Sequence, residues 1–352
     1  MERAAYRIVD ANFNRAREAL RVMEEYCRFA LNCEPLSGRA KQMRHELSAA
    51  IGQLDAGALL AGRDTLGDVG AGLTVENQLQ RGSLADAFTA AAKRLPEALR
   101  ALAETIQAGS AATAGEIERL RYEAYTFEKD VVLFANPIEK SNRVRLYVII
   151  TSNLPAEVLT LASQCASGGA DCIQLRAKGI PDDRLFALAV EFAEICREMG
   201  SLSIINDRAD IATVAGADGV HLGQDDLPVE QVRRLQLSPL IIGKSTHTAH
   251  ELERVIGTRP SYVSLGCVFP TPTKPKIDIA GLDYVRAGLE RLRDTGISHV
   301  AIGGVTLDNL AQVLAAGAER VAICEAITAV PNPGDACRRF KDKLNAHFDT
   351  SS

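Results

Sequence analysis

The 352-residue sequence lacks several features that would assign it to a class at once. It has no C-x-x-C pair and no apolar run of the roughly 18 residues that a membrane-spanning helix needs. Charges are spread through its N-terminus, which therefore has no apolar signal-peptide core. The formal net charge is only −5, from 40 basic and 45 acidic residues, which argues against a general nucleic-acid-binding surface. We therefore expect a cytoplasmic protein with neither a nucleic-acid nor a membrane partner.

The eight cysteines predict buried thiols rather than disulfides or a metal site. Most of them lie in apolar runs such as ADCIQL and RVAICEAI, and they do not cluster with histidines at the spacing of zinc ligands. Hydrophobic residues make up 47% and charged residues 24%, which is the composition of a globular protein. The length predicts two or three domains.

The segment from about Arg7 to Leu133 has the apolar period of helices. Its first apolar stripe consists of Phe13, Ala16, Leu20, Met23, Cys27 and Ala30. Further helices are predicted at 37–54, 83–108 and 115–133, the one at 83–108 with Ser83 as its cap and Pro96 as an interruption. Residues 62–73 predict a loop, and 136–143 predict a short linker after an all-α domain spanning 1–135.

From Arg145 onward, short β-branched runs alternate with amphipathic stretches of helix length, which predicts βα units and a parallel sheet. The eight runs lie at 145–151, 171–178, 202–208, 218–224, 240–246, 262–270, 299–306 and 320–327. So many strands in about 200 residues fit a (β/α)8 TIM barrel better than a doubly wound sheet. The predicted fold class is α/β, a TIM barrel over 144–348 that follows an N-terminal helical domain.

Polar residues stand at five consecutive strand ends, where the chemistry of such a barrel is located. They are Gln174, Arg176 and Lys178; Asn206, Asp207 and Arg208; Gln224, Asp225 and Asp226; Lys244, Ser245 and His247; and Thr271, Thr273 and Lys274. Any one of these residues could be a solvated strand end or a helix cap. Because all five sets should converge on one mouth, together they indicate a site.

The residue types in this set indicate an anionic ligand and a hard cation. Arg176, Lys178 and Lys274 supply positive charge, while Asp207 and Asp226 suit a cation bound through oxygen, usually Mg²⁺ shared with phosphate. A second anion site is indicated by the glycine pair 303–304 and by the backbone near 324–326, after the seventh and eighth runs. The inferred ligands are one diphosphate and one monophosphate.

Six motifs within about 143–348 together resemble the thiamine phosphate synthase family. They are QLRAK (174–178), IINDR (204–208), GADGVHLGQDD (216–226), IGKSTHT (242–248), GCVFPTPTK (266–274) and IGGVT (302–306). The resemblance implies a transferase of thiamine biosynthesis that joins hydroxymethylpyrimidine diphosphate to thiazole phosphate, releases pyrophosphate and requires Mg²⁺. It implies small-molecule substrates and leaves homo-oligomerisation open.

The resemblance also implies a role for each matching residue. Gln174, Arg176, Lys178 and Asn206 would contact the pyrimidine diphosphate, Ser245 and Lys274 the diphosphate or pyrimidine, Thr271, Thr273 and the Gly304 backbone the thiazole phosphate, and Asp207 and Asp226 the magnesium. Arg176, Lys178 and Lys274 would be catalytic through charge and positioning, without a protein nucleophile. The sequence departs from the family pattern at Ala177, Cys324 and Glu325, and a Glu325 carboxylate facing a phosphate would repel it.

Other functions of the barrel remain open at this point. It could be a thiazole tautomerase-like enzyme, a ligand sensor, or a Schiff-base aldolase that uses Lys178, Lys244 or Lys274.

Residues 7–29, together with GRDTLGDVG, resemble an N-terminal extension of some thiamine phosphate synthases that is associated with hydroxymethylpyrimidine phosphate kinase activity. No Walker A motif supports nucleotide binding there.

The polar line along the first predicted helix is consistent with either a solvated bundle face or a phosphate site. It consists of Arg7, Asp10, Asn14, Arg17, Arg21 and Arg28. Arg17 and Arg21 are the candidates for phosphate binding. A kinase role and a structural or oligomerising role are both retained for this domain.

Overall fold

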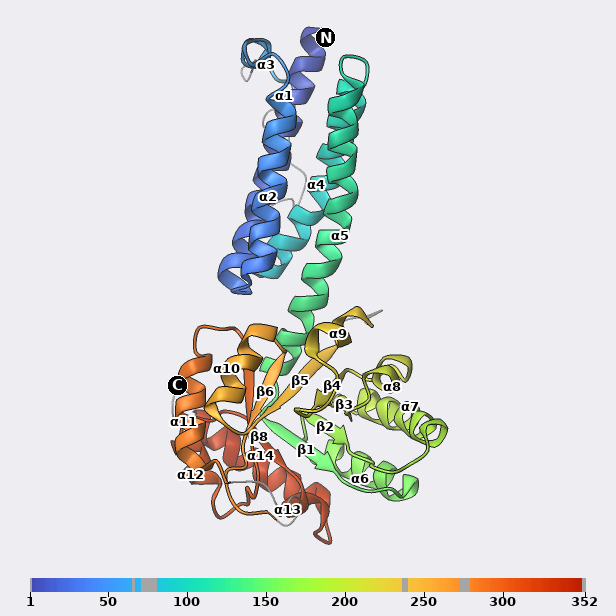
Figure 1. The fold of residues 1–352 in the computed structure, drawn as a ribbon, viewed down its shortest axis with the longest axis vertical. Helices are drawn as coiled ribbons and strands as arrows, with labels where there is room; N and C mark the ends of the chain where they lie inside the picture. The colour runs from blue at the N-terminus through green and yellow to red at the C-terminus, as the bar shows by residue number, and fades with distance from the viewer. Residues whose placement is uncertain (1, 65–66, 71–80, 236–239, 272–278, 350–352) are drawn as a thin grey trace. The chain divides into compact units, whose positions relative to one another are not determined.

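The structure is a computed structural model that describes residues 2–64, 67–70, 81–235, 240–271 and 279–349. The chain forms two compact units, Met1–Val132 and Leu133–Ser352 (Figure 1). Among the described helices, none has both the length and the apolar character needed to cross a bilayer.

The first unit is helical, as predicted. Its elements are α1 (Arg3–Glu25), the π-helical turn η1 (Tyr26–Ala30), α2 (Glu34–Ile51), α3 (Ala56–Gly62), α4 (Leu84–Ile106) and the first part of α5 (Ala111–Asn142). Most of the predicted stripe on α1 is buried: Ala16, Leu20, Met23 and Cys27 lie in the core, where α1 packs against α2 and α4. Ala30, at the end of the stripe, is exposed.

Two expectations for the helical region were wrong. Pro96 does not interrupt the helix, because α4 continues through it and buries apolar residues on both sides, including Leu95 and Leu99. Residues 136–142 are not a linker but the end of α5. Contacts within the second unit hold this segment: Lys140 pairs with Asp218 at 2.7 Å, and the Ser141 hydroxyl lies 3.3 Å from the Ser261 carbonyl oxygen. Such tertiary contacts override local turn propensity. Ser83 caps α4 as predicted, by accepting from the Asp86 N–H.

The second unit is a closed barrel of eight parallel strands in sequence order, which confirms the predicted TIM barrel (Figure 1). The strands are β1 (Leu146–Ile150), β2 (Cys172–Leu175), β3 (Leu202–Asn206), β4 (Gly219–Leu222), β5 (Ile241–Thr246), β6 (Tyr262–Leu265), β7 (Ser298–Ile302) and β8 (Val321–Ile323). The helices are α6 (Pro155–Ser167), α7 (Asp182–Glu198), α8 (Ala209–Val214), α9 (Val229–Arg234), α10 (Ala249–Thr258), α11 (Gly281–Leu292), α12 (Leu310–Ala315), α13 (Glu325–Thr328) and α14 (Pro333–Asp349).

Strand alternation divides the barrel core into two layers. On β1, Leu146, Val148 and Ile150 belong to the large outer cluster between strands and helices, whereas Tyr147 and Ile149 belong to the interior cluster. Every second strand residue therefore points into the barrel. Inward residues from several strands, among them Tyr147 near the start of β1 and Tyr262 at the start of β6, form the floor of the cavity described below.

Candidate active site

A cavity of about 540 Å³ opens at the carboxyl ends of the barrel strands, within the size range of small-molecule sites. The predicted site residues that line it are Gln174, Arg176, Lys178, Asn206, Asp207, Asp226, Ser245, Thr271 and Gly304. Thr273 and Lys274 lie outside the described residues. Gln224, Asp225 and His247 also line the cavity.

Two of the strand-end cations are directed elsewhere. Arg208 forms ion pairs with Asp182 and Asp210, which lie at the starts of α7 and α8. Lys244 is not among the lining residues, and its ammonium group donates to the Gly223 carbonyl oxygen at 2.5 Å. Strand alternation explains the position of Lys244, because its neighbour Ser245 points into the barrel.

The polar face of β2 continues beyond the strand end into the cavity. Gln174, Arg176 and Lys178 are spaced two residues apart, and all three line it. The Gln174 amide donates to Asn206 Oδ1 at 2.7 Å, and the Lys178 ammonium lies 3.2 Å from the Asp207 carboxylate. Ala177, between them, packs against the outer cluster and points away from the cavity. The ends of β2 and β3 thus place two cations beside a carboxylate and an amide.

Asp207 has a left-handed backbone, with φ of 64°, a conformation that few non-glycine residues adopt and that aspartate adopts more readily than most. Its N–H donates to the His221 carbonyl oxygen at 2.8 Å, which fixes this turn against β4. The pKa of Asp226 is raised, first by burial and then by the nearby Asp207 carboxylate. The two carboxylates therefore lie close together at the cavity mouth.

This carboxylate pair fits a hard divalent cation, which would relieve the repulsion between the two groups. Within the described ranges, no group of three or more His, Cys, Asp or Glu side chains is placed to hold a metal ion. Mg²⁺ does not require such a group, because it often binds through one or two carboxylates and takes its other oxygens from phosphate and water. The donor set thus fits a cation that arrives with an anionic ligand.

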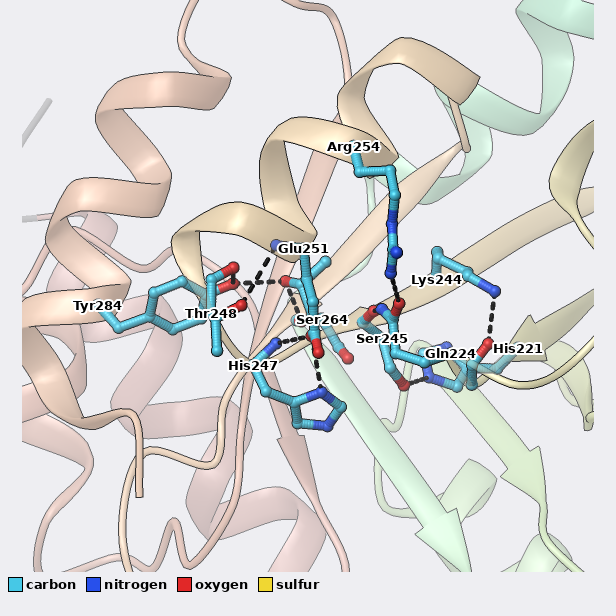
Figure 2. A network of polar contacts seen from close by, with 12 residues as sticks. His221, Gln224, Lys244, Ser245, His247, Thr248, Glu251, Arg254, Ser264 and Tyr284 are labelled. Carbon is cyan, nitrogen blue, oxygen red and sulfur yellow. Dashed lines mark hydrogen bonds and ion pairs between the residues drawn. The ribbon is translucent and has the colours of Figure 1, made fainter. Parts of the chain in front are cut away.

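The loop that carries Asp226 is tied to the neighbouring strand β5 through Gln224, which Figure 2 shows beside Ser245. The Gly223 N–H donates to Asp226 Oδ2 at 2.6 Å, and the Gln224 amide donates to the Ser245 carbonyl oxygen at 2.5 Å. The Arg254 guanidinium on α10 donates to Gln224 Oε1 at 2.6 Å. These bonds connect the ends of β4 and β5.

The cavity floor contains aromatic residues that the strand-end prediction missed. The Tyr147 hydroxyl donates to Gln174 Oε1 at 3.3 Å, so the Tyr262 hydroxyl, 2.9 Å away, donates to Tyr147. Tyr262 can then accept from His221 Nδ1, and His221 Nε2 accepts from Ser245 Oγ, each at 2.9 Å. Burial holds the pKa of both tyrosines well above the ordinary value, so the hydroxyls stay neutral.

A period-two signal for these residues is present in the sequence. Tyr147, Ile149 and Thr151 alternate along one face of β1 and its continuation, and Tyr262 and Ser264 alternate along β6. Only the closed barrel shows that this face is the inner one.

The opposite side of the cavity is formed by the ends of β7 and β8. Gly303 and Gly304 both have positive φ, and a Cβ at Gly304 would lie 2.4 Å from the Pro270 carbonyl oxygen. Packing alone therefore requires glycine at 304. Cys324 and Glu325 also line the cavity here.

In the helical unit, the polar line on α1 forms contacts both within the helix and with the segment that follows α3. Asp10 accepts two hydrogen bonds from the Arg63 guanidinium, at 2.7 and 2.8 Å. Arg21 pairs with Glu25 at 2.8 Å, and Arg17 lies over the Phe13 ring. The local contacts of the exposed Arg17 and Arg21 suit a solvated helix face.

Known proteins match both units of the chain. Residues 146–327 match the family model described as Thiamine monophosphate synthase, and residues 7–130 match the ThiD2 family model. Among solved structures, thiamine phosphate pyrophosphorylase from Pyrococcus furiosus superposes with a TM-score of 0.54 at 29% identity. The match covers 59% of this chain and 98% of that one.

Named relatives align with almost the whole of this chain. The thiamine-phosphate synthase of a Nostoc species is 36% identical over 346 residues, which cover 98% of this chain and 95% of that protein. The thiamine-phosphate synthase of a Synechocystis species is 37% identical over 343 residues, 97% of each chain. The resemblance indicated by the motifs is confirmed. The chain belongs to the thiamine phosphate synthase family, a transferase family of thiamine biosynthesis, and carries a ThiD2 family domain at its N-terminus.

Proposed function

We propose that the barrel joins hydroxymethylpyrimidine diphosphate to thiazole phosphate and releases pyrophosphate. The observation that carries this proposal is the juxtaposition of Lys178 with Asp207, and of Asp207 with Asp226, above a neutral hydrogen-bonding floor. Cations and a carboxylate pair at one mouth suit a diphosphate that binds with a divalent cation. A floor of neutral amide and hydroxyl groups suits an uncharged heterocycle.

The geometry supports separate binding regions for the two substrates along the cavity. Arg176 and Lys178 hold the diphosphate, while Gln174, Asn206 and Ser245 receive the pyrimidine ring. Thr271 and the backbone at Gly304 receive the thiazole phosphate on the opposite side. Thr273 and Lys274 are assigned to the same contacts on the sequence motif alone.

Asp207 and Asp226 are the residues that would hold Mg²⁺. When bound, Mg²⁺ neutralises diphosphate charge and so makes it a better leaving group. Arg176 and Lys178 stabilise the same charge from the β2 side, through preorganised groups that need no rearrangement during the reaction. The pyrimidine methylene then carries positive charge, which its electron-rich ring stabilises, and the thiazole nitrogen bonds to it.

The cavity contains a serine–histidine pair, but its surroundings do not favour a serine nucleophile. Ser245 donates to His221, and the other ring nitrogen of His221 contacts Tyr262. In a catalytic triad a carboxylate occupies that third position and stabilises the imidazolium. The neutral Tyr262 hydroxyl does not supply that charge, so we assign the pair to the pyrimidine floor.

The test is to incubate the full chain with both substrates and Mg²⁺, and to measure pyrophosphate and thiamine phosphate together. Equal amounts of the two products support the proposal, whereas release of neither rejects it. Thiazole isomerisation without pyrophosphate would instead identify a tautomerase. Borohydride-trapped substrate on Lys178 would identify a Schiff-base enzyme.

For the helical unit, we propose phosphorylation of hydroxymethylpyrimidine phosphate as a second activity, because the ThiD2 match lies in the same chain as a domain that uses the diphosphate. The test is to supply the pyrimidine monophosphate, ATP and Mg²⁺ to the full-length Asp207→Asn variant, whose barrel should leave the diphosphate unused. Diphosphate accumulation supports a kinase, and its absence leaves the structural role.

We also propose that the protein acts in the cytoplasm, since its eight cysteines are free thiols.

A further inference from the structure

We propose that Lys244, Gln224 and Arg254 form a clamp that positions Asp226 for cation binding. The clamp acts on residues 223–226, which we call the Asp226 loop. The inference rests on the proposed magnesium-dependent function and extends it to two residues, Lys244 and Arg254, that do not line the cavity. These two are positioning residues and act through Asp226.

Lys244 holds the start of the loop. It lies on β5 opposite Leu222, the last residue of β4, and its ammonium group donates to the Gly223 carbonyl oxygen at 2.5 Å (Figure 2). The side chain is buried, and within the described part of the chain no carboxylate lies within ion-pair distance of it. Burying a cation is costly unless its donors are well used. The bond to Gly223 and the attraction of the Asp226 carboxylate together account for the buried Lys244.

Gln224 and Arg254 hold the next residue of the loop. The Gln224 amide nitrogen donates to the Ser245 carbonyl oxygen, and the Gln224 amide oxygen accepts from Arg254 on α10 (Figure 2). Both ends of the Gln224 amide are thereby tied to β5 and to the helix that follows it. Lys244 thus holds the Gly223 backbone, while Ser245 and Arg254 hold the side chain of Gln224.

The clamp determines where the Asp226 carboxylate lies. The Gly223 N–H donates to Asp226 Oδ2 at 2.6 Å, so the residue that Lys244 holds also orients the carboxylate. That orientation places Asp226 beside Asp207. A loop free to shift would lose this alignment, which a cation bound by both carboxylates requires.

Positioning and simple charge effects predict opposite results when Lys244 is removed. A positive charge near a cation site repels the cation, so loss of the charge alone would tighten cation binding. Loss of the hydrogen bond to Gly223 would loosen the Asp226 loop and weaken cation binding. Whether cation binding tightens or weakens when Lys244 is replaced therefore distinguishes a charge effect from a positioning effect.

The experiment measures binding of Mn²⁺, an oxygen-seeking stand-in for Mg²⁺, to the full chain by the electron paramagnetic resonance signal of the free ion. We expect Lys244→Met to weaken Mn²⁺ binding by about tenfold, which is about 1.4 kcal/mol, and Lys244→Arg to restore most of it. The Mg²⁺ concentration for half-maximal pyrophosphate release should rise in parallel, while the KM for thiazole phosphate stays unchanged. The exposed Arg254→Met change should weaken Mn²⁺ binding by about threefold without unfolding the chain.

Tyr284→Phe is the matched control. Tyr284 bonds to Thr246 and Thr248 in the same network (Figure 2), and these hydrogen bonds do not involve the Asp226 loop. Its loss should leave Mn²⁺ binding unchanged. Equal or tighter binding in Lys244→Met, or an equal loss in Tyr284→Phe, would overturn the clamp. If the unaltered chain bound no Mn²⁺ and released pyrophosphate without Mg²⁺, the proposed metal role would fail instead.

Discussion

The Lys178 ammonium lies 3.2 Å from the Asp207 carboxylate, across the ends of the neighbouring strands β2 and β3. The Lys178 side chain is 60% exposed, so this ion pair contributes less than about 1 kcal/mol to stability. Because this ion pair lies at the cavity mouth, we expect it to affect function rather than stability. Lys178 pairs with one member of the carboxylate pair, and it is available to an incoming diphosphate.

Replacing Lys178 should therefore affect activity far more than stability. We expect Lys178→Met to lower pyrophosphate release by at least about tenfold while shifting the urea midpoint little. The matched control is Lys140→Met, which removes a similarly exposed Lys–Asp pair with Asp218, remote from the cavity. Equal activity losses in the two variants would contradict the assigned role.

We expect activity to require both carboxylates of the pair. Asp207→Asn and Asp226→Asn each remove one negative oxygen ligand, and we expect turnover at fixed Mg²⁺ to fall by about tenfold or more. Raising the Mg²⁺ concentration should recover part of the loss. Asp183→Asn, an exposed change in the first turn of α7, serves as the control and should behave as the unaltered chain. Full activity in either cavity variant would remove that residue from the cation site.

The aromatic floor should affect pyrimidine binding selectively. Tyr147→Phe removes the hydroxyl that donates to Gln174 and accepts from Tyr262, which leaves the Gln174 amide less well oriented. Loss of about 1 kcal/mol of hydrogen bonding corresponds to about a fivefold rise in the KM for the pyrimidine diphosphate. Steady-state kinetics with each substrate varied in turn would check this. An equal rise in the KM for thiazole phosphate would show that the floor is not specific for the pyrimidine.

A buried histidine should make the barrel less stable in acid. Burial, with Arg320 and Arg145 nearby, lowers the pKa of His299 to about 3, and its Nε2 accepts from the Glu319 N–H. The unfolded chain has a pKa near 6.5 at this residue and therefore binds more protons between pH 6.5 and pH 3. The stability that His299 contributes is present above pH 6.5 and is lost as the pH falls. Between pH 7 and pH 5 the loss is about 2 kcal/mol.

Urea unfolding of the barrel at several pH values would measure this effect. The non-titrating His299→Gln variant keeps an acceptor and should show a shallower loss of stability between pH 7 and pH 5. Identical slopes for the two proteins would show that His299 does not control acid stability.

Much of the barrel could be predicted because the local sequence preferences for strands agree with the tertiary structure there. Each of the eight strands contains a valine or isoleucine within a largely buried run, which is typical of parallel strands. The positions of Gln174, Asp207 and Asp226 followed from one rule, that polar residues at strand ends converge on the mouth. The helical region was less predictable. Pro96 and residues 136–142 carry strong breaker signals, yet packing keeps both helical.

The sequence by itself determined the number and order of the barrel strands and the strand ends that carry the site, because these depend on periodicity and local composition. Its motifs indicated the family. Only the tertiary structure decided the direction of individual side chains. Lys244 and Ser245 are adjacent on β5, and closure of the barrel places Ser245 in the cavity and Lys244 behind the Asp226 loop. The same closure turns Tyr147 and Tyr262 inward as the cavity floor. Side-chain alternation defines two faces, but which face is inner depends on how all eight strands pair.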